Sequence, residues 1–184
     1  EPGEKVQITI GDRSGGGPGS RAQTFFEPQH FFRVSVDTAG NGEYVALSDT
    51  PSVAVVGGDA VRLVALVPSG VVVDEPFPLL IRAEDAWGNP SSTYRGTVRL
   101  AFDDEATSGA LPTDEVTFPD EDGGVRFIEG CRLSEPGLHR IHVADEAVAL
   151  AADSNPILCV DEREPYQLYW GDPHGGQLHM AEKI

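Results

Sequence analysis

The chain has 184 residues and a formal net charge of −17. This acidity argues against nucleic acid as a partner, because the phosphate backbone selects surfaces rich in Lys and Arg. No run of about 18 apolar residues occurs, so the sequence predicts no membrane span. Hydrophobic residues make up 40% of the chain, enough for a packed core, and 21 glycines with 14 prolines favour short strands joined by turns.

The first third of the chain predicts a small β module over residues 1–67. Alternating apolar and polar residues indicate strands at residues 6–10 and 31–36. A turn at residues 37–42 and a returning strand at 44–47 complete an expected hairpin. Two more strands are expected at residues 53–56 and 61–67.

The middle of the chain, residues 68–160, has the rhythm of an antiparallel β-sandwich. Turn signals separate its apolar runs every 8 to 15 residues or so, as two packed sheets require. The expected strands are Phe77–Glu84, Gly96–Phe102, Val116–Phe118, Val125–Ile128, Leu138–Val143 and Ile157–Val160.

Two stretches of this region need closer interpretation. In the strand 138–143, residues His139, Ile141 and Val143 share the face that we expect to be buried. His139 is then expected to be a hydrogen-bonded core residue rather than a ligand. Residues 144–152 are helix-prone by propensity, but they fit a loop with a strand equally well.

Residues 81–100 contain an Asp-x-x-Gly-Asn-Pro run, followed by Tyr-x-Gly-Thr-Val. This pattern resembles bacterial immunoglobulin-like repeats of surface and secreted proteins. Gly88-Asn89 can supply the positive φ of a tight turn, and Pro90 stops strand pairing there. The resemblance implies an immunoglobulin-like sandwich and an extracellular or periplasmic location, and it implies almost nothing about a ligand.

The segment 161–184 contains Tyr-Trp-Gly-Asp-Pro-His-Gly. It resembles the Tyr-Trp-Gly-Asp-Leu-His-Gly motif of an uncharacterised bacterial family (domain of unknown function 3604), whose members look like distant relatives of the PHP metal-dependent phosphoesterases. The resemblance implies that Asp172 and His174 are metal ligands on the first strand of a hydrolase domain. The PHP pattern would place a second histidine at position 176, which is Gly176 here, so His179 is the candidate substitute.

One carboxylate with imidazole nitrogens suits Zn, Mn or Fe. Such a centre needs further ligands from later strands, which these 184 residues do not supply. We therefore expect the metal to belong to a parent protein that continues past Ile184. This chain alone is expected to bind no metal tightly and to show no hydrolase activity, and whether the parent is an enzyme stays open.

Other candidate sites are weaker. The acidic turns 103–105 and 120–124 could bind calcium, although most such turns are only solvated. Cys131 and Cys159 could pair or remain free thiols. The aromatic residues that could stack on a sugar, or else fill a core, are Phe25, Phe26, Phe31, Phe32, Trp87 and Tyr94.

The sequence thus predicts an all-β protein, an immunoglobulin-like antiparallel β-sandwich with an additional N-terminal β module. Two functions remain open. One is a non-catalytic accessory region of a secreted metal-dependent hydrolase, with the remainder of the parent protein as its partner. The alternative is a carbohydrate-binding, adhesive or spacer module that contacts a glycan or small molecule and has no link to catalysis.

Overall fold

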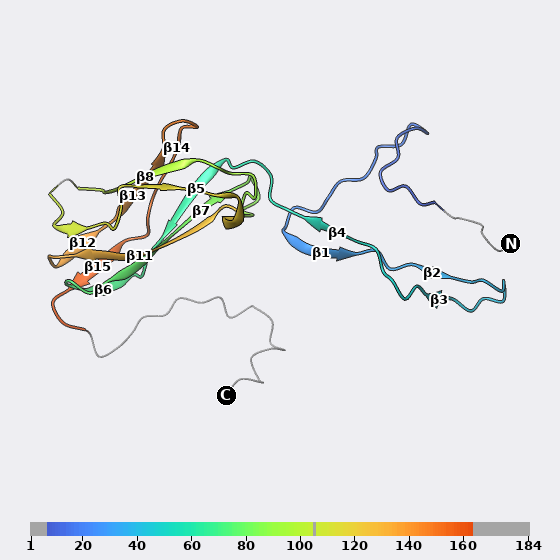
Figure 1. Cartoon of the computed structure of the whole chain (residues 1–184), viewed down its shortest axis with the longest axis horizontal. Coiled ribbons are helices and arrows are strands. Elements are labelled where there is room, and N and C mark those ends of the chain that lie inside the picture. The colour runs from blue at the N-terminus through green and yellow to red at the C-terminus, as the bar shows by residue number, and fades with distance from the viewer. Residues whose placement is uncertain (1–6, 105, 164–184) are drawn as a thin grey trace. The chain divides into compact units, whose positions relative to one another are not determined.

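The structure is a computed structural model that describes residues 7–104 and 106–163. Within these ranges it is all-β, with one short 3-10 turn, η1 (Asp120–Asp122), and no α-helix (Figure 1). The strands are β1 (Glu27–Phe31), β2 (Ser35–Val36), β3 (Val45–Ala46), β4 (Ser52–Val55), β5 (Arg62–Leu66), β6 (Gly70–Val72), β7 (Phe77–Glu84), β8 (Thr97–Phe102), β9 (Gly109–Ala110), β10 (Glu115–Thr117), β11 (Val125–Leu133), β12 (Gly137–His139), β13 (Ile141–Asp145), β14 (Leu150–Asp153) and β15 (Ile157–Val160).

The chain divides into two compact units. One comprises Glu1–Leu63, Arg82–Gly96 and Phe118–Val125, and the other comprises Val64–Ile81, Thr97–Thr117 and Arg126–Ile184. The second unit contains most of the sandwich, and the first contains β1 to β4, the start of β5, the end of β7 and two loop segments. The expected divisions at residues 67 and 160 stay predictions.

The sandwich has an immunoglobulin-like topology, which confirms the expected fold class. One sheet has the order β5-β7-β11-β9, and another has the order β10-β8-β13-β14. The first strand of the sandwich is divided into β5 and β6, which lie in different sheets. β5 neighbours β7, whereas β6 pairs in parallel with β15. Figure 1 shows β6, β12 and β15 together at one end of the sandwich. This division of strands between two sheets is typical of immunoglobulin-like sandwiches.

The core lies between the sheets, on the side chains that alternate inward along each strand. Strand β7 alternates buried and half-buried residues as far as Ala83. In β11 the buried side changes between Ile128 and Cys131, around Gly130, whose φ is 93°. A glycine in this conformation permits a bulge, and it explains why alternation alone predicted a strand that ends too early, at Ile128.

The expected strand 138–143 is two strands. β12 pairs with β15, whereas β13 pairs with β8 and β14, so the chain changes pairing partners at Arg140. His139, Ile141 and Val143 are all buried, as predicted. His139 Nε2 lies 3.2 Å from the carbonyl oxygen of Glu135, which confirms it as a hydrogen-bonded core residue. Residues 144–152 take the non-helical alternative: they comprise the end of β13, a turn at residues 146–149 and the start of β14.

The N-terminal predictions are partly wrong. Residues 7–10 of the predicted strand 6–10 form no strand, since they pair with none of the strands that the structure describes. Ile8 and Ile10 are exposed. The single strand expected at 31–36 is interrupted at residues 32–34 between β1 and β2. The expected hairpin is present, with Ser35 opposite Ala46 and Val36 opposite Val45. β1 and β4 form a second antiparallel ribbon.

No helix within residues 7–104 and 106–163 has the length and apolar character needed to cross a bilayer.

Candidate functional site

The predicted metal ligands Asp172, His174 and His179 lie outside the described residues, so their arrangement stays a prediction. Within residues 7–104 and 106–163, no three His, Cys, Asp or Glu side chains are grouped to hold a metal ion. The best-defined polar constellation is instead the Asp85–Asn89 loop, which carries the Asp-x-x-Gly-Asn-Pro pattern.

The Asp85 carboxylate organises this loop from within. Its Oδ1 accepts hydrogen bonds from the backbone amides of Trp87 and Asn89, both at 2.9 Å. Its Oδ2 accepts a bond from the Gly58 amide at 3.1 Å. Gly88 has a φ of 89°, as the turn pattern predicted. The loop conformation is therefore fixed by a buried carboxylate and one glycine.

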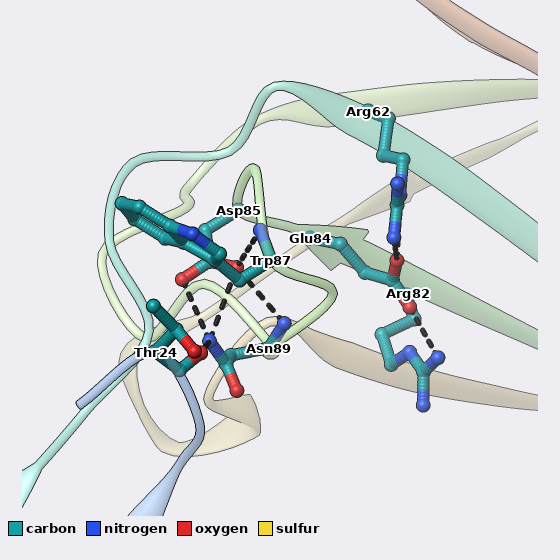
Figure 2. Close-up of polar contacts among 7 residues, drawn as sticks. All are labelled: Thr24, Arg62, Arg82, Glu84, Asp85, Trp87 and Asn89. Carbon is teal, nitrogen blue, oxygen red and sulfur yellow. Dashed lines mark hydrogen bonds and ion pairs between the residues drawn. The ribbon is translucent and has the colours of Figure 1, made fainter.

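Asn89 connects this loop to a distant part of the same unit. Its side-chain amide donates to the Thr24 carbonyl oxygen at 2.8 Å and to Asp85 Oδ2 at 3.0 Å (Figure 2). Its Oδ1 accepts a hydrogen bond from the Phe26 amide at 2.8 Å. We call Asp85 and Asn89, with the Thr24 and Phe26 backbone that Asn89 holds, the clasp. All four side-chain polar atoms of Asp85 and Asn89 are engaged within the chain.

The clasp lowers the pKa of Asp85 well below its ordinary value of 3.8. The largest cause is the side-chain hydrogen bond from Asn89; burial opposes it, and the amides of Asn89, Gly58 and Trp87 add to it. Each of these donors favours the ionised carboxylate. Asp85 is thus a fixed anion that accepts hydrogen bonds, which is the opposite of what a general acid requires.

A second buried carboxylate, Glu84, lies directly before the clasp. Its Oε2 is 2.7 Å from Arg62 Nε and 2.6 Å from Arg62 Nη2, and its Oε1 pairs with Arg82 (Figure 2). Because both oxygens face guanidinium groups, the buried charge of Glu84 is compensated. The sequence analysis did not predict this triad. The only sign of it in the sequence is that Glu84, a charged residue, ends the largely apolar strand β7.

A surface depression of about 610 Å³ lies beside the clasp. Trp87, a predicted stacking residue, borders it and is 67% exposed. Phe25, Phe26 and Phe31 are also exposed. Tyr94 is buried against Phe118 in an edge-to-face contact with ring centroids 5.1 Å apart, so it belongs to the core and cannot stack on a ligand. The depression is lined by Arg21, Ala22, Gln23, Thr24, Val55, Val56, Gly58, Asp85, Trp87 and Asn89.

The remaining candidates are the acidic turns and the two cysteines, and the structure gives both a structural role. In the acidic turns, Asp103 accepts a hydrogen bond from the Arg140 amide and Asp120 pairs with Arg95, while Glu105 lies outside the described residues. Cys131 and Cys159 are both buried and free. Burial raises the pKa of the Cys131 thiol to about 11, which suits an inert core residue.

Comparisons with known proteins give relatives of undefined function. No protein-family model matches the sequence. An uncharacterised protein of Chlamydia muridarum (strain MoPn / Nigg) is 28% identical over 183 residues, and one of Chlamydia trachomatis serovar D is 27% identical over 183 residues. Each alignment covers 95% of this chain and 28% of the relative. A Chlamydia pneumoniae protein is 28% identical over 157 residues, which is 85% of this chain and 24% of that protein. The chain therefore spans about a quarter of the length of these relatives.

Among solved structures, the chain is similar to a glycosyl hydrolase family 2 member from Bacteroides cellulosilyticus. The TM-score is 0.48 at 10% sequence identity, and the match covers 65% of this chain and 16% of that one. No functional inference follows from this likeness.

Proposed function

We propose that this chain is a non-catalytic β-sandwich accessory region of a longer, secreted, metal-dependent hydrolase. The observation that carries the accessory role is the clasp. Asp85 and Asn89 form a polar cluster in which all four side-chain polar atoms bind the chain itself. Such a loop orders a neighbouring segment and leaves no free group for chemistry.

The hydrolase part of the proposal rests on the resemblance of the Tyr-Trp-Gly-Asp-x-His motif. In the parent protein, Asp172 and His174 would bind Zn, Mn or Fe, with His179 as the candidate third ligand. The length of the Chlamydia relatives is consistent with a chain that has a second, larger part.

Metal analysis of the natural, longer protein tests this proposal. We expect bound transition metal and metal-dependent hydrolysis of phosphoester substrates, both lost in the double variant Asp172→Ala/His174→Ala. The matched control is Asp120→Ala, an exposed carboxylate that pairs with Arg95, and it should retain both properties. A natural protein that ends at Ile184, or a longer one whose metal content is unchanged by the double variant, contradicts the proposal.

The exposed Trp87 favours a second candidate function, a glycan-binding module. An indole ring beside a depression lined by Arg21 and Gln23 offers a stacking face with polar neighbours. Glycan-array screening of the 184-residue chain tests it. Binding that is lost in Trp87→Ala and kept in Tyr44→Ala, a change at another exposed aromatic residue, supports this function. Absence of binding to any glycan removes it.

A further inference from the structure

The β2–β3 hairpin carries one continuous aliphatic face. Val36 lies opposite Val45, and the Leu47 amide donates to the Val34 carbonyl oxygen at 3.0 Å, which extends the same register by one pair. Because side chains alternate between the faces of a ribbon, these four residues share one face. The opposite face carries the Ser35–Ala46 pair.

This aliphatic face is open to solvent. Val36 is 40% exposed, Val45 is 67% exposed and Leu47 is 46% exposed. No residue between 7 and 56 is buried, so the hairpin has no core of its own. Two-stranded ribbons are marginally stable in water, and clustered apolar side chains of this kind mark contact surfaces.

Hydrogen bonds within its own turn nevertheless hold the hairpin in shape without a partner. Asp37 accepts hydrogen bonds at its Oδ1 from the Gly40 amide at 2.7 Å and at its Oδ2 from the Gly42 amide at 2.8 Å. The amides of Ala39 and Asn41 also donate to Asp37 Oδ1. A turn that is held by its own carboxylate reduces the ordering entropy that binding must overcome.

We infer that the aliphatic face of the hairpin, Val34, Val36, Val45 and Leu47, docks onto the part of the same polypeptide that lies outside these 184 residues. The relatives support this occupant, because about three quarters of their length lies beyond the aligned segment. Self-association through this face is disfavoured by a net charge of −17, which makes two copies repel.

The charges around the face define the surface that it contacts. Residues 33–49 carry three acidic residues, Asp37, Glu43 and Asp49, and one basic residue, Arg33. The complementary surface is therefore apolar with a rim of Lys or Arg. This inference rests on the part of the proposed function that makes the chain a region of a longer polypeptide, and it does not require a metal.

Hydrogen exchange of the natural, longer protein and of the 184-residue chain tests the inference. We expect the Leu47 amide to exchange about tenfold or more slowly in the longer protein, because docking suppresses local opening. In that protein Val36→Thr/Val45→Thr should return exchange to the rate of the short chain, since threonine keeps the β propensity but places hydroxyls on the face. The matched change on the opposite face, Ser35→Thr/Ala46→Thr, should leave the protection intact.

Equal Leu47 exchange in the two proteins overturns the inference, as does equal loss of protection in both double variants. Protection that appears in the short chain as its concentration rises also overturns it, in favour of a second copy as the occupant. The outcome is separable from that of the hydrolase proposal: a longer protein that protects Leu47 but binds no metal keeps the docking surface and loses the hydrolase.

Discussion

Leu79 and Leu47 are both leucines, but they lie in two regions that are stabilised by different kinds of interaction. Leu79 lies in β7 of the sandwich with no exposed surface, whereas Leu47 follows β3 in the N-terminal hairpin and is 46% exposed. The sandwich is held by burial between two sheets. The N-terminal region is held by carboxylates and an amide at particular points, Asp37 in the hairpin and Asp85 with Asn89 in the clasp. Apolar packing thus stabilises one region, and local polar contacts position the other.

The largest expected effect compares these two leucines directly. Leu79→Ala should lower the free energy of unfolding by about 2–5 kcal/mol, because it leaves a cavity in a closed core. Leu47→Ala should change the same free energy by less than about 0.5 kcal/mol, as exposed substitutions do. Urea denaturation of the 184-residue chain measures both. Similar losses in the two variants would show that the hairpin has a core after all.

A glycine pair tests how closely the clasp loop packs within its own unit. A Cβ at Gly57 would lie 2.0 Å from the Pro90 carbonyl oxygen, whereas one at Gly70 would meet nothing within 4 Å. Gly57→Ala should destabilise the protein by about 1–3 kcal/mol through overpacking, and Gly70→Ala should stay within about 0.5 kcal/mol of the wild type. Thermal unfolding separates them; two equal melting temperatures would contradict the close approach.

Removing the Asn89 amide should loosen the segment that it holds. Asn89→Ala leaves the Thr24 carbonyl oxygen and the Phe26 amide without their side-chain partner, at a cost of about 1 kcal/mol. Trypsin should then cut faster after Arg21, while the cut after Arg13 stays at its wild-type rate. Asn41→Ala, which removes an exposed amide from the hairpin loop, is the control and should leave cleavage at Arg21 unchanged. Unaltered cleavage in Asn89→Ala would remove the clasp as a holding element.

The smallest effect is a dependence on pH. The folded-state pKa of Asp85 is depressed below the ordinary 3.8, so its ionised form contributes stability that is fully present above that value. The contribution declines as the pH falls towards the folded-state pKa. Asp85→Asn should therefore be less stable than the wild type at neutral pH, and the difference should narrow below about pH 4. A constant difference down to about pH 3 would contradict an ionised clasp.

The sandwich was predictable wherever a strand shows its period. Phe77–Glu84 and Ile157–Val160 were predicted with both ends correct, because alternation and flanking turn residues mark them. The strand break at Arg140 was not predictable, since residues on both sides keep the same alternation and only the pairing partner changes. Short strands such as β6 and β9 contain too few residues to show a period.

The sequence predicted only part of the clasp. The Gly-Asn-Pro pattern predicted a turn and the positive φ of Gly88. It did not predict that Asn89 reaches Thr24, because that contact joins residues 65 positions apart. The N-terminal alternation misled for a related reason: Ile8 and Ile10 show the period of a strand, but a strand also needs a neighbour to pair with.

Residue-resolved hydrogen exchange on the 184-residue chain tests the contrast between the two regions most directly. We expect the Ser154 amide, which donates to the Ile141 carbonyl oxygen within the sandwich core, to exchange only with global unfolding. The Phe32 and Leu47 amides, bonded to the Pro51 and Val34 carbonyl oxygens of the ribbons, should exchange by local opening at least about a hundredfold faster. Equal protection at all three amides would contradict it.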